Sequence, residues 1–205
     1  MVVSPSPMGK PYQPKDHFFR EAKRRGLRAR SAFKLEEIID RFRLARRGSQ
    51  VLDLGAAPGG FLQVLAKAVG PEGKVVGVDV VPFQPIRDPW VHTLIADVGD
   101  ADFDAKLAAI HEGHFDAVIS DLAPKTTGIR TTDEARSLAL ATRAADIAQR
   151  WGASGSAFLA KLFMGGDFET FRSLLRARYR EVKVVRPEAT RARSIEVYLL
   201  GLGRK

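Results

Sequence analysis

The chain has 205 residues, of which 45% are hydrophobic, and its formal net charge at pH 7 is +9. This length and composition predict one compact α/β domain, and the lack of cysteine excludes a disulfide framework and a thiolate metal site. Because the N-terminus has no apolar signal core and no run approaches about 18 apolar residues, we expect a cytoplasmic protein that does not cross a membrane.

The N-terminal part of the sequence predicts a tail followed by two helices. Residues 1–15 contain four prolines and few apolar groups, which is typical of disorder. A short helix is expected over residues 16–25, and a better defined one over residues 31–42, where apolar residues recur at helical spacing. Residues 16–47 are therefore interpreted as a basic helical extension of a single domain that spans residues 16–205.

From residue 50 onward, short β-rich runs alternate with helical patterns, which is the arrangement of βαβ units in a mostly parallel sheet. Strands are expected at residues 50–55, 74–80, 91–96, 115–121 and 156–162, and helices at residues 59–69, 103–111, 132–150 and 167–178. Two final runs, residues 181–186 and 194–201, are too close for a helical crossover, which needs about a dozen residues, so they should pair antiparallel. The sequence thus predicts seven strands, an antiparallel last strand and helices on both faces.

The stretch VLDLGAAPGGF, residues 51–61, runs from the first predicted strand into a loop of small residues. Gly55, Gly59 and Gly60 would let the backbone approach a ligand at the sheet edge where α/β folds bind ligands, and the following helix N-terminus would favour an anion. The loop matches neither the nucleotide triphosphate motif nor the dinucleotide motif. Asp53 at its entrance disfavours a pyrophosphate but is acceptable beside an ammonium group.

Two further acidic residues end the next two predicted strands. Asp79 could accept hydrogen bonds from both hydroxyls of a ribose, and Asp97 from the amino group of an adenine. With the helix N-terminus for a carboxylate and the region of Asp53 for an ammonium group, these positions match S-adenosylmethionine. The alternative for each acid taken alone is that it simply begins a turn.

The sequence resembles the FtsJ family of ribose 2′-O-methyltransferases over about residues 12–205. The resemblance rests on the segments GLRARSAFKLEEI, DLGAAPGGF, SDLAPKTTG, KLFMGGDF and RARSIEVYLL. It implies a Rossmann-like class I methyltransferase fold and a Lys-Asp-Lys-Glu catalytic set, which falls here on Lys34, Asp121, Lys161 and Glu196. It also implies cofactor contacts at Gly59, Phe61, Asp79, Asp97 and Asp121. Phe61 departs from the tryptophan that the bacterial ribosomal RNA enzymes of the family often have.

The predicted elements support this catalytic set unevenly. Asp121 and Lys161 lie at or near the ends of predicted parallel strands, so both should emerge at the ligand-bearing edge of the sheet. Lys161 interrupts an apolar strand, where a buried ammonium must be paired or lose its proton, although structural ion pairing is the commoner explanation. Without the resemblance, Lys34 would be a surface lysine of a basic helix and Glu196 a solvent-facing strand residue.

The chemistry of these four residues suits methyl transfer to a ribose 2′-hydroxyl. Positioning can contribute ~7 to 11 kcal/mol, and a general base typically adds ~10² to 10⁴-fold. Lys161 is assigned as the general base, while Asp121 and Glu196 orient Lys161 and Lys34. Asp121 would also favour the positive sulfonium, and no metal is required.

The charge distribution agrees with an RNA substrate. Residues 15–47 hold 12 Lys/Arg against 5 Asp/Glu, and residues 172–205 hold 10 against 3. We expect the RNA-binding surface to include Arg20, Lys23, Arg24, Arg25, Arg28, Arg30, Arg191 and Arg193. The alternative is a solvated charged surface. The target nucleotide should be flipped or unpaired, and the polar loop 125–135 is either a lid over the pocket or an ordinary connection.

The resemblance implies a uridine in the A loop of 23S ribosomal RNA as the target, within the large ribosomal subunit, and we expect a monomer without affinity for DNA or membranes. A transfer RNA anticodon loop is an alternative substrate, and a non-catalytic RNA-binding ribosome-assembly factor is an alternative function. A nicotinamide oxidoreductase lacks its pyrophosphate motif here. A base N-methyltransferase lacks its Asn/Asp-Pro-Pro-aromatic loop, which residues 121–124 replace.

Overall fold

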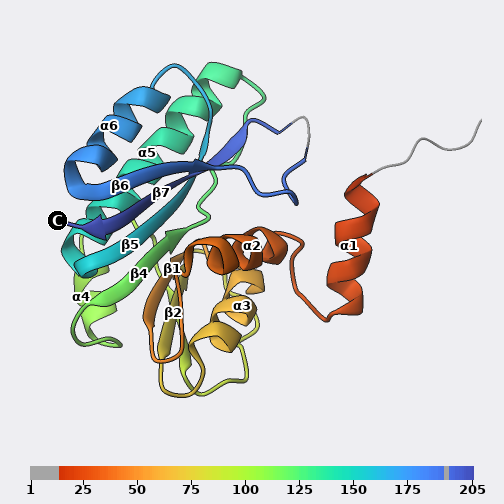
Figure 1. Cartoon of the computed structure of the whole chain (residues 1–205), viewed down its shortest axis with the longest axis vertical. Coiled ribbons are helices and arrows are strands. Elements are labelled where there is room, and N and C mark those ends of the chain that lie inside the picture. The colour runs from red at the N-terminus through yellow and green to blue at the C-terminus, as the bar shows by residue number, and fades with distance from the viewer. Residues whose placement is uncertain (1–13, 192–193) are drawn as a thin grey trace, which may run out of the picture.

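One seven-stranded sheet runs through the computed structural model, which describes residues 14–191 and 194–205 (Figure 1). Its strands are β1 Gln50–Leu54, β2 Lys74–Asp79, β3 Val91–Ile95, β4 Phe115–Ser120, β5 Gly152–Phe163, β6 Tyr179–Val185 and β7 Glu196–Arg204. The strand order is β3-β2-β1-β4-β5-β7-β6. Neighbours from β3 to β5 are parallel, and β7 is antiparallel to both β5 and β6. The predicted sheet with an antiparallel last strand is thereby confirmed.

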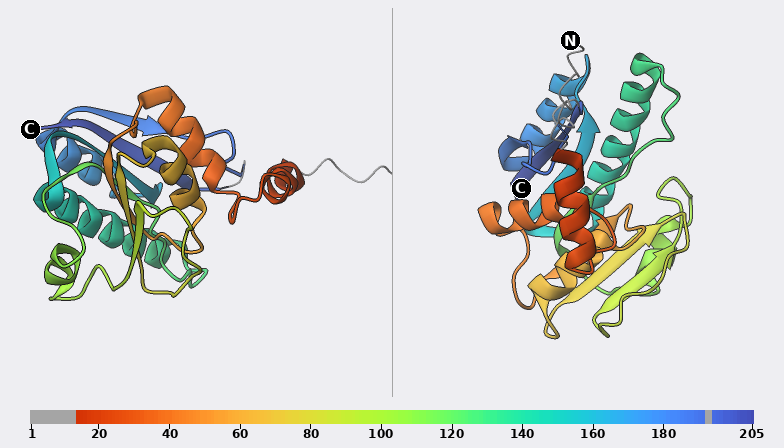
Figure 2. Two further views of the ribbon diagram at one scale, coloured as in Figure 1. Left: turned by 90° about the horizontal axis from the view of Figure 1, so that it is seen from below. Right: turned by 90° about the vertical axis from the view of Figure 1, so that its right-hand side faces the viewer.

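Helices cover both faces of this sheet, as expected (Figures 1 and 2). They are α1 Pro14–Arg24, α2 Ala32–Phe42, α3 Gly60–Val69, α4 Phe103–Ala108, α5 Arg130–Trp151 and α6 Phe168–Arg178. Helices α2 and α3 share one hydrophobic core with the sheet, and α4, α5 and α6 share the other. Within the described ranges, no helix has the length and apolar character needed to span a membrane.

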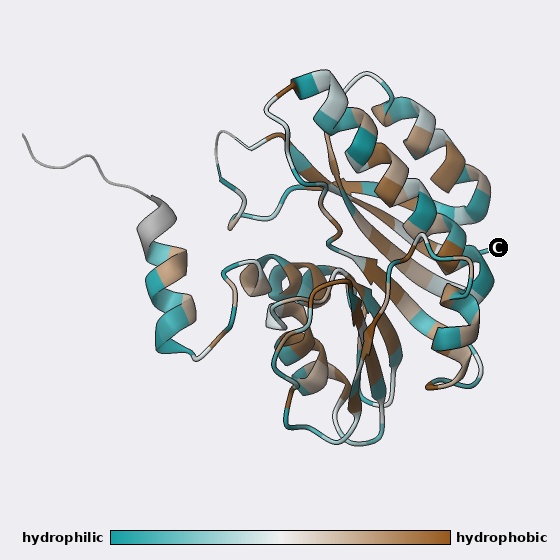
Figure 3. Ribbon diagram, turned by 180° about the vertical axis from the view of Figure 1, so that it is seen from behind, coloured by the Kyte–Doolittle hydropathy of each residue, from teal (hydrophilic) through white to brown (hydrophobic). Residues whose placement is uncertain are grey.

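Strand β1 shows why the sheet lies between two cores. Val51 belongs to the core of α2 and α3, whereas Leu52 and Leu54 belong to the core of α4, α5 and α6. All three side chains are fully buried, because a strand in the middle of a parallel sheet is covered on both faces. Figure 3 shows the same division, with hydrophobic strands inside and hydrophilic residues on the outward faces of the helices.

Helix α1 stands outside these layers (Figures 1 and 2). The Phe18 and Phe33 rings connect it to α2, with centroids 5.6 Å apart. An ion pair of 2.5 Å between Arg25 and Glu36 joins the same two regions. Helix α2, in contrast, is part of a layer, because its Leu35 is fully buried in the core. Only the first helix of the predicted extension is therefore peripheral.

Most element boundaries differ from the sequence prediction by a few residues, including the starts of α1 and β5. Helix α1 begins at Pro14, so the last two residues of the predicted tail are helical, and residues 1–13 lie outside the described part of the chain. Strand β5 begins at Gly152, four residues before the predicted start. The added segment pairs with β4 across a register shift beside Phe115. Its small and polar residues, GASG, carry no apolar alternation, which explains the missed start.

Candidate active site

The ends of β4 and β5 place Asp121 beside Lys161. Asp121 follows the last residue of β4, and Lys161 lies near the end of β5. Lys161 Nζ lies 3.0 Å from Asp121 Oδ1 and donates a hydrogen bond of 2.8 Å to the Asp121 backbone oxygen. Lys161 is only 7% exposed. Its ammonium group is therefore buried and paired, as the interruption of an apolar strand indicated.

A second buried ion pair joins α2 to β7. Lys34 Nζ lies 3.0 Å from Glu196 Oε2, and Lys34 is also only 7% exposed. Burial alone would raise the pKa of Glu196, but the charge and hydrogen bond of Lys34 and the charge of Lys161 together hold that pKa below its usual range. Glu196 is consequently ionised at neutral pH, and Lys34 is not the surface lysine that its basic helix suggested.

Tyr198 links the two ion pairs, and the sequence analysis missed it. Its hydroxyl donates a hydrogen bond of 2.8 Å to Asp121 Oδ1, and Lys34 Nζ lies 5.8 Å from the centroid of its ring. Tyr198 faces Lys161 across the β5–β7 pairing. Burial, reinforced by the charge and hydrogen bond of Asp121, raises the pKa of the Tyr198 hydroxyl well above its usual value. The hydroxyl therefore remains a donor at any physiological pH.

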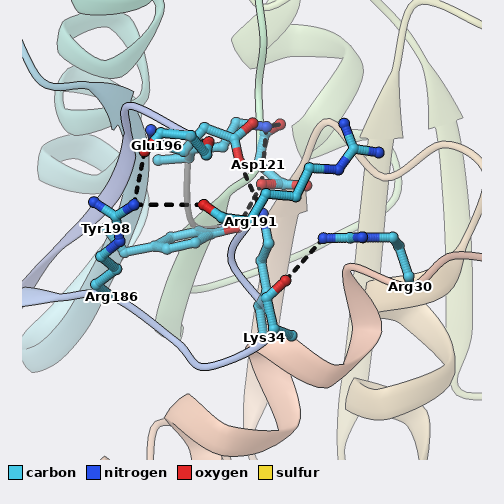
Figure 4. Close-up of polar contacts among 10 residues, drawn as sticks. Arg30, Lys34, Asp121, Arg186, Arg191, Glu196 and Tyr198 are labelled. Carbon is cyan, nitrogen blue, oxygen red and sulfur yellow. Dashed lines mark hydrogen bonds and ion pairs between the residues drawn. The ribbon is translucent and has the colours of Figure 1, made fainter. Parts of the chain in front are cut away.

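The structure thus gathers all four residues of the predicted set in one network. Figure 4 shows Lys34, Asp121 and Glu196 of this set around Tyr198. Tyr198 could have been found from the alternation in SIEVYLL, because residues two apart in a strand share a face and Glu196 had already been singled out. This arrangement offers two ammonium groups, two carboxylates and a phenol at the edge of the sheet. Such a group can orient an amine and exchange a proton with a bound hydroxyl.

The glycines of the loop after β1 make room chiefly for neighbouring protein atoms. A Cβ at Gly55 would lie 2.9 Å from the backbone nitrogen of Leu122, and one at Gly60 would lie 2.9 Å from the Cβ of Ala29. Gly55 and Gly59 also have positive φ angles, +85° and +104°. Close approach of the chain to itself thus explains these glycines, which were predicted to let a ligand approach.

Asp53 lies beneath this loop with an enclosed carboxyl group. Its side chain is 0% exposed, and neither oxygen has a hydrogen-bond partner among the residues that the structure describes. Burial raises the pKa of Asp53 well above its usual value, and the negative charges of Asp121 and Asp79 raise it further. Asp53 therefore has no face open to a ligand in this structure, and the predicted direct contact with an ammonium group is not available here.

Asp79 and Asp97 occupy the expected edge of the sheet, and both organise local turns. Asp79 Oδ2 accepts from the Ala57 nitrogen at 2.8 Å, and Oδ1 accepts from the Val81 nitrogen at 2.9 Å. Asp97 Oδ1 accepts from the Gly99 nitrogen at 2.8 Å. The turn-forming role is thus present for both acids. No carboxylate oxygen accepts more than one of these bonds, so capacity for a ligand remains.

Phe61 lies in the hydrophobic core. Only 4% of the residue is exposed, and it packs in the core shared by α2, α3 and the sheet. The apolar periodicity of α3 explains this, because Phe61 and Leu65 are four residues apart on one helical face. Phe61 is therefore a core residue in this structure and presents no open aromatic face.

Asp133 fixes the start of α5 and the loop before it. Its Oδ1 accepts hydrogen bonds from the nitrogen and hydroxyl of Thr127, at 2.7 and 2.9 Å, and Oδ2 accepts from the Gly128 nitrogen at 3.1 Å. Helix α5 begins at Arg130, so the second half of the predicted loop 125–135 is helical. These contacts favour the ordinary connection over the lid.

The predicted RNA-binding residues have different partners. Arg24 is paired with Glu21 at 2.6 Å, and Arg25 with Glu36. The guanidinium of Arg28 donates to three backbone carbonyl groups. Arg20, Lys23 and Arg191 are exposed, and Arg193 lies outside the residues that the structure describes. The guanidinium of Arg28 is thus engaged with the protein itself in this structure.

The two basic ends of the chain meet beside the catalytic set. Arg30 donates a hydrogen bond of 2.9 Å to the backbone oxygen of Ala189, and the Glu188 nitrogen donates one of 2.8 Å to Glu37 on α2. Burial and then the like charge of Arg191 lower the pKa of the Arg30 guanidinium. Figure 4 shows Arg30 and Arg191 next to the network of Lys34. A polyanion could therefore contact both ends at once.

A family model described as FtsJ-like methyltransferase matches residues 27–204, which include every element from α2 to β7. The chain belongs to the FtsJ-like methyltransferase family. It is 62% identical to the Ribosomal RNA large subunit methyltransferase E of Myxococcus xanthus over 100% of this chain and 96% of that protein. It is 54% identical to the protein of the same name from Anaeromyxobacter sp. (strain Fw109-5), over 96% of this chain and 71% of that one.

Solved structures support the family fold. A crystal structure described as a ribosomal RNA methyltransferase from Plasmodium falciparum superposes with a TM-score of 0.76. The match covers 86% of this chain and 98% of that one at 23% sequence identity, which is evidence for the fold alone. The FtsJ-like protein thus has the Rossmann-like methyltransferase fold that its motifs implied.

Proposed function

We propose that the protein is an S-adenosylmethionine-dependent ribose 2′-O-methyltransferase whose substrate is a uridine in the A loop of 23S ribosomal RNA. We also propose that it acts as a cytoplasmic monomer on the large ribosomal subunit. The observation that carries this proposal is the pair of buried ion pairs, Lys161–Asp121 and Lys34–Glu196, joined through Tyr198 in an FtsJ-like chain. The names of the relatives support the large-subunit substrate over transfer RNA.

The electrostatics of the loop region fit S-adenosylmethionine. Among the described residues, Asp53 has no hydrogen-bond partner, and Asp79 and Asp121 lie close enough to raise its pKa, which favours its neutral form. Asp121 is paired with Lys161, whereas Asp79 forms no ion pair with a lysine in the described part of the chain, so its charge favours a cationic ligand. When bound, S-adenosylmethionine supplies a methyl group on a positively charged sulfonium. The residues proposed to hold it are Gly55, Gly59, Gly60, Asp79, Asp97 and Asp121.

Lys161, in its neutral amine form, is the proposed acceptor of the 2′-hydroxyl proton and becomes an ammonium group in the step. Two directions around its Nζ are occupied by the backbone oxygen and Oδ1 of Asp121, at 2.8 and 3.0 Å. The third direction is therefore left for a substrate hydroxyl. Asp121 aligns the amine, and Glu196 of the neighbouring pair lies close enough to interact electrostatically with Lys161. A general base held in this way typically contributes ~10² to 10⁴-fold to the rate.

RNA would approach over the meeting point of the two basic ends. Its proposed contacts are Arg20, Lys23, Arg30, Arg191 and Arg193. Arg24 and Arg25 are already paired with carboxylates, so we expect smaller contributions from them. Phosphate contacts supply affinity without sequence information, so the choice of nucleotide depends on which unpaired ribose reaches Lys161.

Mapping 2′-O-methyl groups in cells with and without the protein tests this proposal. One A-loop uridine of 23S ribosomal RNA should lose its methyl group when the protein is removed and regain it when the wild-type chain is restored. Restoration of Lys161→Met is the matched control and should leave the site unmethylated. A change confined to a transfer RNA anticodon loop would contradict the substrate, and an unchanged methylation pattern would contradict the enzymatic function.

A further inference from the structure

Arg28 connects two loops that are far apart in the sequence. Its Nη1 donates to the backbone oxygens of Pro58, at 3.2 Å, and of Gln84, and its Nη2 donates to that of Pro85 at 2.8 Å. Pro58 lies in the glycine loop after β1, and the other two lie in the loop that follows β2 and Asp79. One guanidinium thus bridges the two loops that border the proposed cofactor site.

The backbone around Arg28 is fastened to the same region. Its nitrogen donates a hydrogen bond of 2.8 Å to Gln63 Oε1, and Gln63 Nε2 donates one of 2.9 Å to the backbone oxygen of Gly26. Gln63 is in the first turn of α3, directly after the glycine loop. A Cβ at Gly59 would lie only 2.7 Å from Arg28 Nη1, so glycine there also makes room for this side chain.

The side-chain chemistry favours arginine at this position. A guanidinium is a planar fork of five donors and can bond several carbonyl oxygens in fixed directions, whereas an ammonium group is a compact charge on a flexible stem. Lysine would therefore keep the charge of Arg28 and lose the bridge. Since the three acceptors are backbone oxygens of two loops, the bridge fixes their relative positions.

We propose that Arg28 is a positioning residue that holds the two cofactor loops together and joins them to the segment that connects α1 to α2. This inference rests on the proposed function, because it takes these loops as the S-adenosylmethionine site. Cofactor binding and the order of the basic N-terminal helix are consequently coupled. Coupling between two sites is reciprocal, so RNA held by α1 also strengthens cofactor binding.

The proposal is tested by titrating S-adenosylmethionine into the full chain and measuring its affinity by calorimetry, for the wild type and for Arg28→Lys. We expect its affinity for the cofactor to fall about tenfold or more. Arg41→Lys is the matched control, because Arg41 is an exposed arginine of α2 paired with Glu37, and its affinity should match wild type. Circular dichroism melting checks that each variant is folded, and Gln63→Ala provides a second, independent break in the same connection.

Hydrogen exchange supplies a readout that a merely structural arginine would not change. In the wild type, S-adenosylmethionine should slow amide exchange over residues 17–28, and in Arg28→Lys this slowing should disappear. The inference is overturned if cofactor affinity stays within threefold of wild type in both Arg28→Lys and Gln63→Ala. It is also overturned if the cofactor slows amide exchange in Arg28→Lys as much as in the wild type. A wild-type chain that does not bind S-adenosylmethionine overturns the proposed function as well, which distinguishes the two failures.

Discussion

The enclosed carboxyl group of Asp53 predicts an unusual dependence of stability on pH. Its pKa in the folded protein lies well above the value of 3.8 expected for the unfolded chain. The contribution of Asp53 to the free energy of unfolding is therefore fully present below pH 3.8 and is lost as pH rises to the folded pKa. Between these two pKa values the folded state holds one more proton than the unfolded state. The free energy of unfolding of the wild type should thus fall by up to about 1.4 kcal/mol per pH unit relative to Asp53→Asn.

Urea denaturation of the wild type and Asp53→Asn at pH 4.5, 5.5 and 6.5 measures this difference. Asparagine has nearly the same shape and does not ionise, so any cost of its buried amide is a constant offset. We expect the variant to gain stability over the wild type with each step in pH. A difference that stays constant between pH 4.5 and 6.5 would refute the argument, because Asp53 would then titrate alike in both states.

The catalytic network yields two further predictions. Tyr198→Phe removes a hydrogen bond to the Asp121 carboxylate, an interaction worth ~1.5–3 kcal/mol. We therefore expect the methyl-transfer rate to fall about tenfold or more while cofactor affinity is retained. An unchanged kcat would contradict this prediction. Lys34→Met leaves Glu196 half-buried without its partner and should cost about 1–3 kcal/mol of stability at pH 7. Since the pKa of Glu196 is lowered in the folded protein, the stability lost in Lys34→Met should become smaller as pH falls below 4.5. Equal losses of stability at pH 4 and pH 7 would contradict this prediction.

Much of the fold could be predicted because apolar residues report burial directly. The alternation of β-rich runs with helical patterns indicated a mostly parallel sheet, and the short gap before β7 indicated an antiparallel pair. The early start of β5 could not be predicted, since Gly152 and its neighbours pair through their backbones and bury few side chains. Pairing between backbones leaves little trace in a sequence.

The site was predictable in its charged residues and less so in its geometry. Motif resemblance located Lys34 and Glu196, although their local patterns suggested solvent exposure. The contacts of Phe61 and Arg28 with the protein itself were not predicted, because an aromatic residue or arginine beside a motif looks the same in sequence whether it contacts a ligand or the protein. For Phe61 the helical spacing already indicated the core. For Arg28 the three acceptors are backbone oxygens, which no sequence pattern reveals.

Single-turnover methyl transfer by Lys161→Ala tests the central claim most directly. The assay uses purified protein, S-adenosylmethionine and large ribosomal subunits that lack the methyl group, with cofactor affinity measured in parallel. Loss of the amine should reduce transfer by about 10²-fold or more while cofactor affinity stays close to that of the wild type. Transfer within threefold of the wild type would contradict the assignment of Lys161 as the group that accepts the ribose proton.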